Sequence, residues 1–219
     1  MPLSPSALRL YLVMGSQDCR GRDPAWILQE AIAGGVTLFQ FREKDSSLSM
    51  TQTVSLGKQL RELCAKYRIP FIVNDRVDLA MILDADGVHL GQDDLPPVEV
   101  RPLLETNALI GISTETPEEA KAAAQAGADY LGVGAMYATR SKPDAGKPIG
   151  PEGIRRINCK VSHPLPVVGI GGIDGNNAKE VIQAGAAGIA VISAITHADS
   201  PRRAAAELRE IVERSRLKS

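Results

Sequence analysis

The chain repeats one pattern along its length, in which a short apolar run is followed by a polar loop and then an amphipathic stretch. Short runs rich in β-branched or aromatic residues are typical of buried strands. Eight such strands are predicted, at residues 10–13, 38–41, 71–73, 87–90, 109–112, 130–133, 167–170 and 189–192. Because parallel strands need a crossover segment between them, the alternation indicates an α/β fold with a parallel sheet.

The amphipathic stretches have helical periodicity, and several begin with Pro, Asp or Thr, which favour helix starts. Clear examples span residues 24–33, 51–67, 117–126, 176–184 and 202–214. Eight parallel strands could form an open, doubly wound sheet, but their even spacing favours a closed barrel. At 219 residues the chain is near the lower end of the range for a complete (β/α)8 barrel. We therefore predict a single TIM-barrel domain over residues 1–219.

Charge and composition argue for a small-molecule partner. The formal net charge is -1, so there is no broad basic field to attract nucleic acid or an anionic membrane. The three cysteines are widely spaced and form neither a zinc pattern nor a disulfide framework. The sequence shows no signal-peptide pattern and no run of about 18 apolar residues. We expect a cytoplasmic protein without a nucleic-acid or membrane partner, and a homo-oligomer stays open.

Candidate functional residues follow the predicted strands, because the active site of a parallel barrel lies at the carboxyl ends of its strands. Arg42 and Lys44 follow the second strand and Lys142 follows the sixth, which suits a phosphorylated or diphosphorylated substrate. The chain has no Ser-His-Asp order and no nicotinamide fingerprint, which disfavours nucleophilic hydrolysis and hydride transfer. Further candidates at strand ends are Gln40, Glu43, Asn74, Ser113, Thr139, Arg140, Ser141, Ile192 and Ser193.

Two glycines follow the seventh strand, at a place where barrels commonly bind phosphate. Gly171 and Gly172 would let backbone N–H groups approach phosphate oxygens, and Ser193 follows the neighbouring eighth strand. A tight turn without a ligand is the alternative. The joint occurrence of these residues on adjacent late strands favours the phosphate site.

Asp75 and Asp94 follow the third and fourth strands, which are neighbours in a barrel. Mg2+ prefers oxygen ligands and typically bridges one or two carboxylates to substrate phosphates, so this pair indicates a Mg2+ site. Salt bridges with Arg42 or Lys44 would explain the two carboxylates as well. His89 lies near a strand end, where a lone histidine is more often a hydrogen-bonded barrel residue than a base or ligand, and we assign it no role.

Four motifs occur in order at successive strand ends: Gln40-Phe41-Arg42-Glu43-Lys44, Asn74-Asp75, the run of residues 86–94 that ends in Asp93-Asp94, and Gly169-Ile170-Gly171-Gly172-Ile173. Each motif alone is weak, but the ordered set resembles the thiamin phosphate synthase family. The resemblance covers about residues 10–195. It implies an enzyme that joins a pyrimidine diphosphate to a thiazole phosphate, with or without a carboxylate on the thiazole, and releases diphosphate in a dissociative, Mg2+-assisted substitution.

The resemblance also implies roles for individual residues. Asp75 and Asp94 would bind Mg2+, and the catalytic residues would be Arg42, Lys44, Ser113 and Lys142. The pyrimidine diphosphate would be held by Gln40, Phe41, Arg42, Glu43, Lys44, Asn74, Ser113 and Lys142. The thiazole phosphate would be held by Thr139, Arg140, Ser141, Gly172, Ile192 and Ser193.

The chain departs from the family pattern at three positions. Family members commonly have Pro where this chain has Ala135 and Ala138, and His where it has Glu115. Losing the prolines should loosen the loop after the sixth strand. The sister family of thiazole tautomerases depends on a histidine near position 115 and tends to lack the full motif set, so an isomerase is the second hypothesis. A catalytically silent phosphate-binding barrel is the third.

Overall fold

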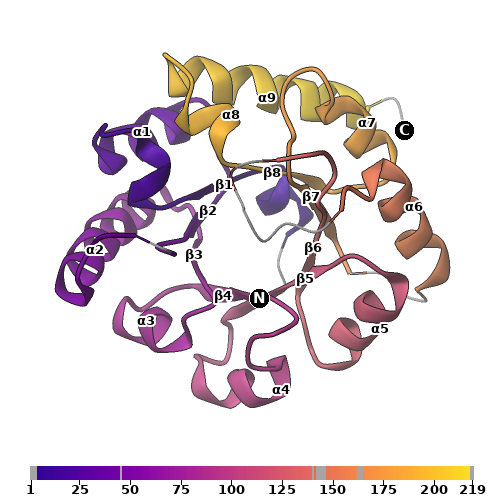
Figure 1. The fold of residues 1–219 in the computed structure, drawn as a ribbon, viewed down its shortest axis with the longest axis horizontal. Helices are drawn as coiled ribbons and strands as arrows, with labels where there is room; N and C mark the ends of the chain where they lie inside the picture. The colour runs from indigo at the N-terminus through magenta and orange to yellow at the C-terminus, as the bar shows by residue number, and fades with distance from the viewer. Residues whose placement is uncertain (1–3, 45, 140, 142–146, 162–164, 218–219) are drawn as a thin grey trace.

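Eight parallel strands form a closed barrel in the computed structural model, which describes residues 4–44, 46–139, 141, 147–161 and 165–217. The strands pair in chain order, and β1 pairs with β8 to close the barrel (Figure 1). The predicted (β/α)8 barrel is confirmed, and each predicted strand lies within two residues of the observed bounds. The strands are β1 (Leu10–Met14), β2 (Leu38–Phe41), β3 (Phe71–Asn74), β4 (Gly87–Leu90), β5 (Leu109–Thr114), β6 (Tyr130–Val133), β7 (Val167–Ile170) and β8 (Gly188–Val191).

Helices surround the barrel on its outside (Figure 1). Helix α1 has the predicted bounds, whereas α7 begins two residues later than predicted because Asn176 and Asn177 form a turn with Asp174. The helices are α1 (Pro24–Ala33), α2 (Met50–Tyr67), α3 (Val77–Ile82), α4 (Pro97–Val100), α5 (Pro117–Gln125), α6 (Gly150–Lys160), α7 (Ala178–Gln183), α8 (Ser193–Thr196) and α9 (Pro201–Arg216). Short 3-10 helices are η1 (Pro5–Leu8), η2 (Ser16–Cys19) and η3 (Arg101–Leu103).

Capping side chains fix where the longer helices begin. The Asp23 carboxylate accepts from the N–H of Ala25 before α1, and the Thr116 hydroxyl accepts from the N–H of Glu119 before α5. Ser49 and Gln52 cap the start of α2 reciprocally. Each such side chain satisfies a backbone N–H that the helix itself leaves without a partner.

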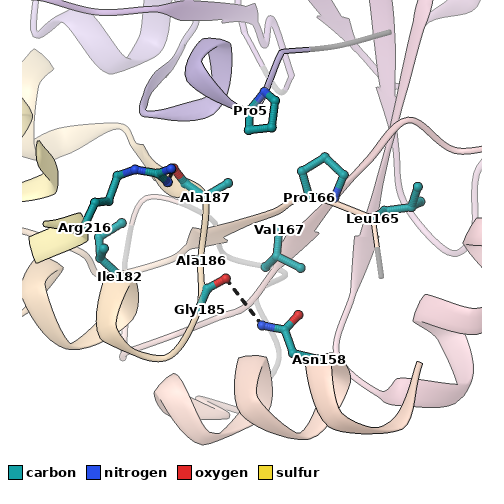
Figure 2. Close-up of a pocket in the computed structure, with 10 residues that line it drawn as sticks. All are labelled: Pro5, Asn158, Leu165, Pro166, Val167, Ile182, Gly185, Ala186, Ala187 and Arg216. Atoms are coloured by element: carbon teal, nitrogen blue, oxygen red, sulfur yellow. Dashed lines mark hydrogen bonds between the residues drawn. The ribbon is translucent and has the colours of Figure 1, made fainter. Parts of the chain in front are cut away.

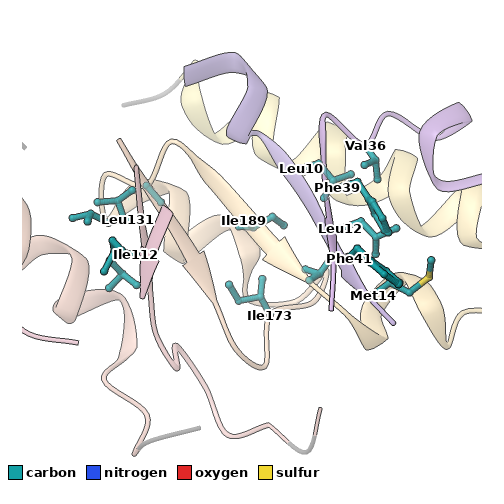
Figure 3. Packing of buried hydrophobic residues seen from close by; sticks show 14 of the residues in the cluster. Leu10, Leu12, Met14, Val36, Phe39, Phe41, Ile112, Leu131, Ile173 and Ile189 are labelled. Carbon is teal, nitrogen blue, oxygen red and sulfur yellow. The ribbon is translucent and has the colours of Figure 1, made fainter. Parts of the chain in front are cut away.

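Strand residues alternate between two apolar layers. Leu10, Leu12 and Met14 face the helices, and they join a large buried cluster between strands and helices (Figure 3). Tyr11 and Val13 face the barrel interior, which is filled by a smaller buried cluster. This alternation follows from strand geometry, in which successive side chains point to opposite faces. Polar groups therefore lie mainly beyond the carboxyl ends of the strands. Within the described part of the chain, no helix combines the length and the apolar character that crossing a membrane requires.

Candidate active site

Lys44, Asp75 and Asp94 come together at the carboxyl ends of β2, β3 and β4. The Nζ of Lys44 lies 3.2 Å from Oδ2 of Asp75. Asp75 has a φ of 57°, a left-handed conformation that is uncommon outside glycine, and its N–H donates to the carbonyl of His89 at 2.9 Å. This backbone bond ties the end of β3 to β4, and the Asp75 side chain lies within hydrogen-bonding reach of Asp94.

The second carboxylate, Asp94, is held by the backbone of its own loop. The N–H of Gly91 donates to Oδ2 of Asp94 at 2.6 Å. Burial raises the pKa of Asp94 above its ordinary value and the neighbouring Asp75 raises it further, against the lowering effects of the Gly91 N–H and of Lys44. The two carboxylates repel each other, so a cation between them would be stabilised.

Residues of β2 divide between the barrel interior and the helix layer. Gln40 is buried in the interior, and its Nε2 donates to the hydroxyl of Tyr11 at 2.7 Å. The next residue, Phe41, points the other way and packs its ring on Phe71 with 6.1 Å between ring centroids. The side chain of Phe41 therefore faces the helices rather than the site.

Arg42 and Glu43 lie just beyond β2 and contact the loop that follows β1. Arg42 is buried, and its carbonyl accepts from Nε2 of Gln17 at 2.9 Å. Burial raises the pKa of Asp18 above its ordinary value, and the charge of Arg42 partly opposes this effect. The Glu43 carboxylate accepts from the N–H of Ser16 at 2.8 Å and from the Ser16 hydroxyl. In this structure Glu43 thus anchors the β1 loop beside Arg42.

Ser113 lies near the end of β5 and is half-buried. Its Oγ is 3.0 Å from Nε2 of His89, and its carbonyl accepts from Nε2 of Gln92 at 2.6 Å. His89 is buried and hydrogen-bonded inside the barrel, the kind of surroundings that the sequence favoured for it.

The residues predicted to hold the thiazole phosphate, as far as the structure describes them, lie at the ends of β6, β7 and β8. Gly171 and Gly172 have φ angles of 97° and 64°, which glycine adopts without strain. Ser141 donates to Oγ of Ser193 at 3.2 Å, and the N–H of Ser141 donates to the Thr139 hydroxyl at 3.2 Å. Ile192 is half-buried and packs against the interior cluster. The late half of the predicted site is therefore assembled from three neighbouring strand ends.

Two predicted residues, Arg140 and Lys142, lie outside the described residues. Asn74 ends β3 and is half-buried.

Sequence reasoning missed Tyr11 and Tyr130, whose hydroxyls lie 2.9 Å apart in the barrel interior. Both tyrosines are inside predicted strands rather than after them, and a tyrosine at an inward strand position is the signal that could have identified them.

A groove of about 540 Å³ lies at the opposite end of the barrel, where β7 and β8 begin (Figure 2). Its polar groups are already used: Nδ2 of Asn158 donates to the carbonyl of Gly185 at 3.4 Å, and Arg216 donates to the carbonyl of Ala187 at 3.0 Å. Because the predicted residues meet at the other end, we do not assign this groove to the active site.

Asp75 and Asp94 have the chemistry that a Mg2+ ion requires. Both are carboxylates, they lie beside each other, and burial together with their mutual repulsion disfavours two negative charges in the absence of a cation. Among the residues that the structure describes, no group of three or more His, Cys, Asp or Glu side chains could hold a metal ion. Mg2+ commonly uses only one or two carboxylates together with water and substrate phosphates, so the pair is compatible with it.

Comparison with known proteins shows the family of the chain. The family model described as thiamine monophosphate synthase matches residues 10–195. The thiamine-phosphate synthase of Geobacillus kaustophilus is 50% identical over 212 residues, covering 96% of this chain and 95% of the relative, and that of Moorella thermoacetica is 47% identical over 209 residues, covering 95% and 98%. A solved thiamine phosphate pyrophosphorylase from Pyrococcus furiosus superposes with a TM-score of 0.85 at 41% identity, covering 96% of this chain and 98% of that one. The predicted resemblance is confirmed, and the chain belongs to the thiamine monophosphate synthase family of transferases.

Proposed function

We propose that this protein joins 4-amino-2-methyl-5-(diphosphooxymethyl)pyrimidine to 4-methyl-5-(2-phosphooxyethyl)thiazole, or to its carboxylated form, and releases thiamin phosphate and diphosphate, together with CO2 when the thiazole carries the carboxylate. The observation that carries the proposal is the division of the site into two halves. The ends of β2, β3 and β4 carry Lys44, Asp75 and Asp94. Gly171 and Gly172, which follow β7, lie with Ser141 and Ser193 at the ends of β6 to β8. A diphosphate and a monophosphate can thus bind side by side in one barrel mouth.

The proposed reaction is a substitution at the pyrimidine methylene carbon. The C–O bond to diphosphate breaks first, and the diphosphate leaves with the bonding electron pair. The lone pair of the thiazole nitrogen then forms the new C–N bond. No protein nucleophile is needed, so the protein acts by holding the two substrates in line and by stabilising the charge of the departing diphosphate.

The side chains of the early half would carry most of that stabilisation. Arg42 is buried, and the planar fork of its guanidinium suits phosphate oxygens in a water-poor site. Lys44 is more exposed and reaches Asp75 across the barrel mouth. Arg140 and Lys142 would add positive charge from the loop after β6, in line with the family resemblance.

Asp75 and Asp94 would hold Mg2+ in this proposal. When bound, the ion would neutralise negative charge on the diphosphate and favour its departure. Lys44 would then be shared between Asp75 and the substrate, because its Nζ lies 3.2 Å from the Asp75 carboxylate in the free protein. Ser113 would contact the pyrimidine from the end of β5.

The test measures diphosphate and thiamin phosphate formed by purified protein from both substrates. We expect formation with Mg2+, loss with EDTA and recovery when Mg2+ is added in excess. Asp75→Asn should lower turnover by about 100-fold, since a loss of about 3 kcal/mol of charge stabilisation is about two factors of ten in rate. The matched control is Asp78→Asn, a nearby and exposed aspartate on α3 that pairs with Arg76, and it should keep wild-type turnover.

Two outcomes would contradict the proposal. Folded protein that releases no diphosphate under any metal condition would favour the isomerase or the silent barrel, and the two can be separated by following tautomerisation of the thiazole. Diphosphate release that persists in EDTA and in Asp75→Asn would leave the synthase standing but remove Mg2+ and its carboxylate ligands from the mechanism.

A further inference from the structure

A continuous chain of hydrogen-bonded side chains crosses the barrel interior beneath the site. Nε2 of Gln40 donates to the hydroxyl of Tyr11 at 2.7 Å, and the Tyr11 and Tyr130 hydroxyls are 2.9 Å apart. The Tyr130 hydroxyl is 3.1 Å from Nδ1 of His89, and Nε2 of His89 is 3.0 Å from Oγ of Ser113. Five side chains from five different strands are thereby connected, and the last of them is a predicted substrate contact.

The buried surroundings make this series of hydrogen bonds costly to break. Tyr11 and Tyr130 are 1% and 0% exposed and lie in an apolar cluster with residues such as Val13 and Ile72. A buried hydroxyl without a partner loses its hydration and gains nothing in return. The low polarity of the interior also strengthens each bond in the chain, so the five groups are expected to keep one arrangement.

Two glycines make room for the rings of the chain. A Cβ at Gly111 would lie 2.1 Å from Cζ of Tyr130 and 2.5 Å from Nδ1 of His89. A Cβ at Gly132 would lie 2.9 Å from Cε1 of His89. The barrel therefore gives up two inward side chains on β5 and β6 to admit an imidazole and a phenol, which packing alone does not require.

The donors and acceptors along this hydrogen-bonded series can be assigned by counting protons. Each tyrosine hydroxyl has one proton to donate. Tyr11 accepts from the Gln40 amide, and the arrangement in which both tyrosine protons also find an acceptor in this series sends the proton of Tyr11 to Tyr130 and that of Tyr130 to Nδ1 of His89. A neutral imidazole that accepts at Nδ1 carries its proton on Nε2, which then donates to Ser113.

We propose that Gln40, Tyr11, Tyr130 and His89 are positioning residues, which fix His89 as the Nε2–H tautomer and thereby present the Ser113 hydroxyl as a donor to the substrate. Once Oγ of Ser113 accepts from His89, its proton is left to point into the site. A ring nitrogen with a lone pair is the matching acceptor on a pyrimidine. This last step rests on the proposed function, whereas the tautomer is a property of the free protein.

The first test is nitrogen-15 NMR of the histidine side chains in the full-length protein without substrate. The two tautomers give different ring nitrogen shifts, and His89 can be assigned with a His89→Gln sample. We expect Nε2 protonated and Nδ1 unprotonated in the wild type, and a loss of that single pattern in Tyr130→Phe. A wild-type His89 protonated at Nδ1, or a tautomer unchanged in Tyr130→Phe, would overturn the proposal.

The second test is steady-state kinetics of Tyr130→Phe. Loss of one oriented hydrogen bond to the pyrimidine should raise KM for the pyrimidine diphosphate about tenfold, which corresponds to about 1.4 kcal/mol, with KM for the thiazole phosphate unchanged. Tyr67→Phe, at the exposed end of α2, is the matched control and should leave both KM values unchanged. A rise in both KM values, or in neither, would contradict an orienting role.

The failure of this proposal can be told apart from failure of the proposed function. Wild-type protein that makes no thiamin phosphate refutes the function, while the NMR pattern still decides whether the chain fixes the tautomer. If Tyr130→Phe does not fold, Tyr11→Phe interrupts the same chain one step earlier and should give the same two readouts.

Discussion

Gly172→Ala should destabilise the protein and disturb the proposed thiazole phosphate half of the site. Gly172 has a φ of 64°, and a Cβ there would lie 2.6 Å from the carbonyl oxygen of Ala138 and 2.9 Å from Cβ of Tyr137. The left-handed backbone costs a residue with a Cβ about 1–2 kcal/mol, and relief of the contact with the backbone adds about 1–2 kcal/mol. Together these terms give about 3 kcal/mol, or about 6–12 °C in Tm for a chain of this length.

Gly175→Ala is the matched control because it changes the same residue type in the same loop. Its φ is not in the left-handed region, and its new Cβ would meet nothing closer than Cδ1 of Ile211 at 3.8 Å. Thermal unfolding of the two variants and of the wild type measures the difference, and steady-state kinetics should show KM for the thiazole phosphate raised in Gly172→Ala only. Equal melting temperatures for the two variants would refute the steric argument, since both carry the same added methyl group.

Three further predictions follow from buried or paired groups. The pKa of Glu213 is lowered because Arg209 and Arg9 outweigh the opposing effect of burial, so its contribution to stability is present above the ordinary pKa of about 4.3 and is lost as pH falls. Glu213→Gln should therefore lower the free energy of unfolding by about 0.5–1 kcal/mol at pH 7, a small value because the side chain is partly exposed. Near pH 3 the variant and the wild type should have the same Tm, and a difference in Tm that persists there would contradict this explanation. Thr196→Val should raise Tm by about 2–4 °C, because the buried Thr196 hydroxyl has no hydrogen-bond partner among the described residues, and a lower Tm would show that the hydroxyl is satisfied. Gly111→Ala should cost about 1–3 kcal/mol through its contact with the Tyr130 ring, measured by denaturant unfolding, and wild-type stability would show that the ring has space to move.

The barrel could be predicted from the sequence because each strand carries its own local signal. Apolar runs such as residues 87–90 and 167–170 are bounded by small or polar residues, and their spacing allows one crossover helix each. The element ends were harder to predict. Helix α7 begins late because the N–H of Asn176 donates to the Asp174 carboxylate and the N–H of Asp174 donates to Oδ1 of Asn177, a local competition that periodicity does not report.

The positions of the candidate residues could be predicted because these residues lie directly after strands. Asp75, Asp94 and Lys44 follow three consecutive strands, so barrel closure alone brings them to one edge, and the structure places Lys44 3.2 Å from Asp75. The direction of each side chain could not be predicted in the same way. Glu43 and Phe41 belong to one five-residue motif, yet one contacts Ser16 in the β1 loop and the other packs under the helices.

The hydrogen-bonded series inside the barrel could not be predicted from the sequence, because its contacts join residues that are far apart in the sequence. Tyr11 and Tyr130 are separated by 119 positions, and only the register of β1 and β6 in the closed barrel turns both hydroxyls to the same point. Glycine inside a strand lowers strand stability, and Gly111 lies inside β5. Its meaning changes once the Tyr130 ring is seen to occupy the space that a side chain would fill. An inward glycine on one strand beside an inward tyrosine on the next is therefore a signal for buried polar chains in barrels, and it can be sought before a structure is known.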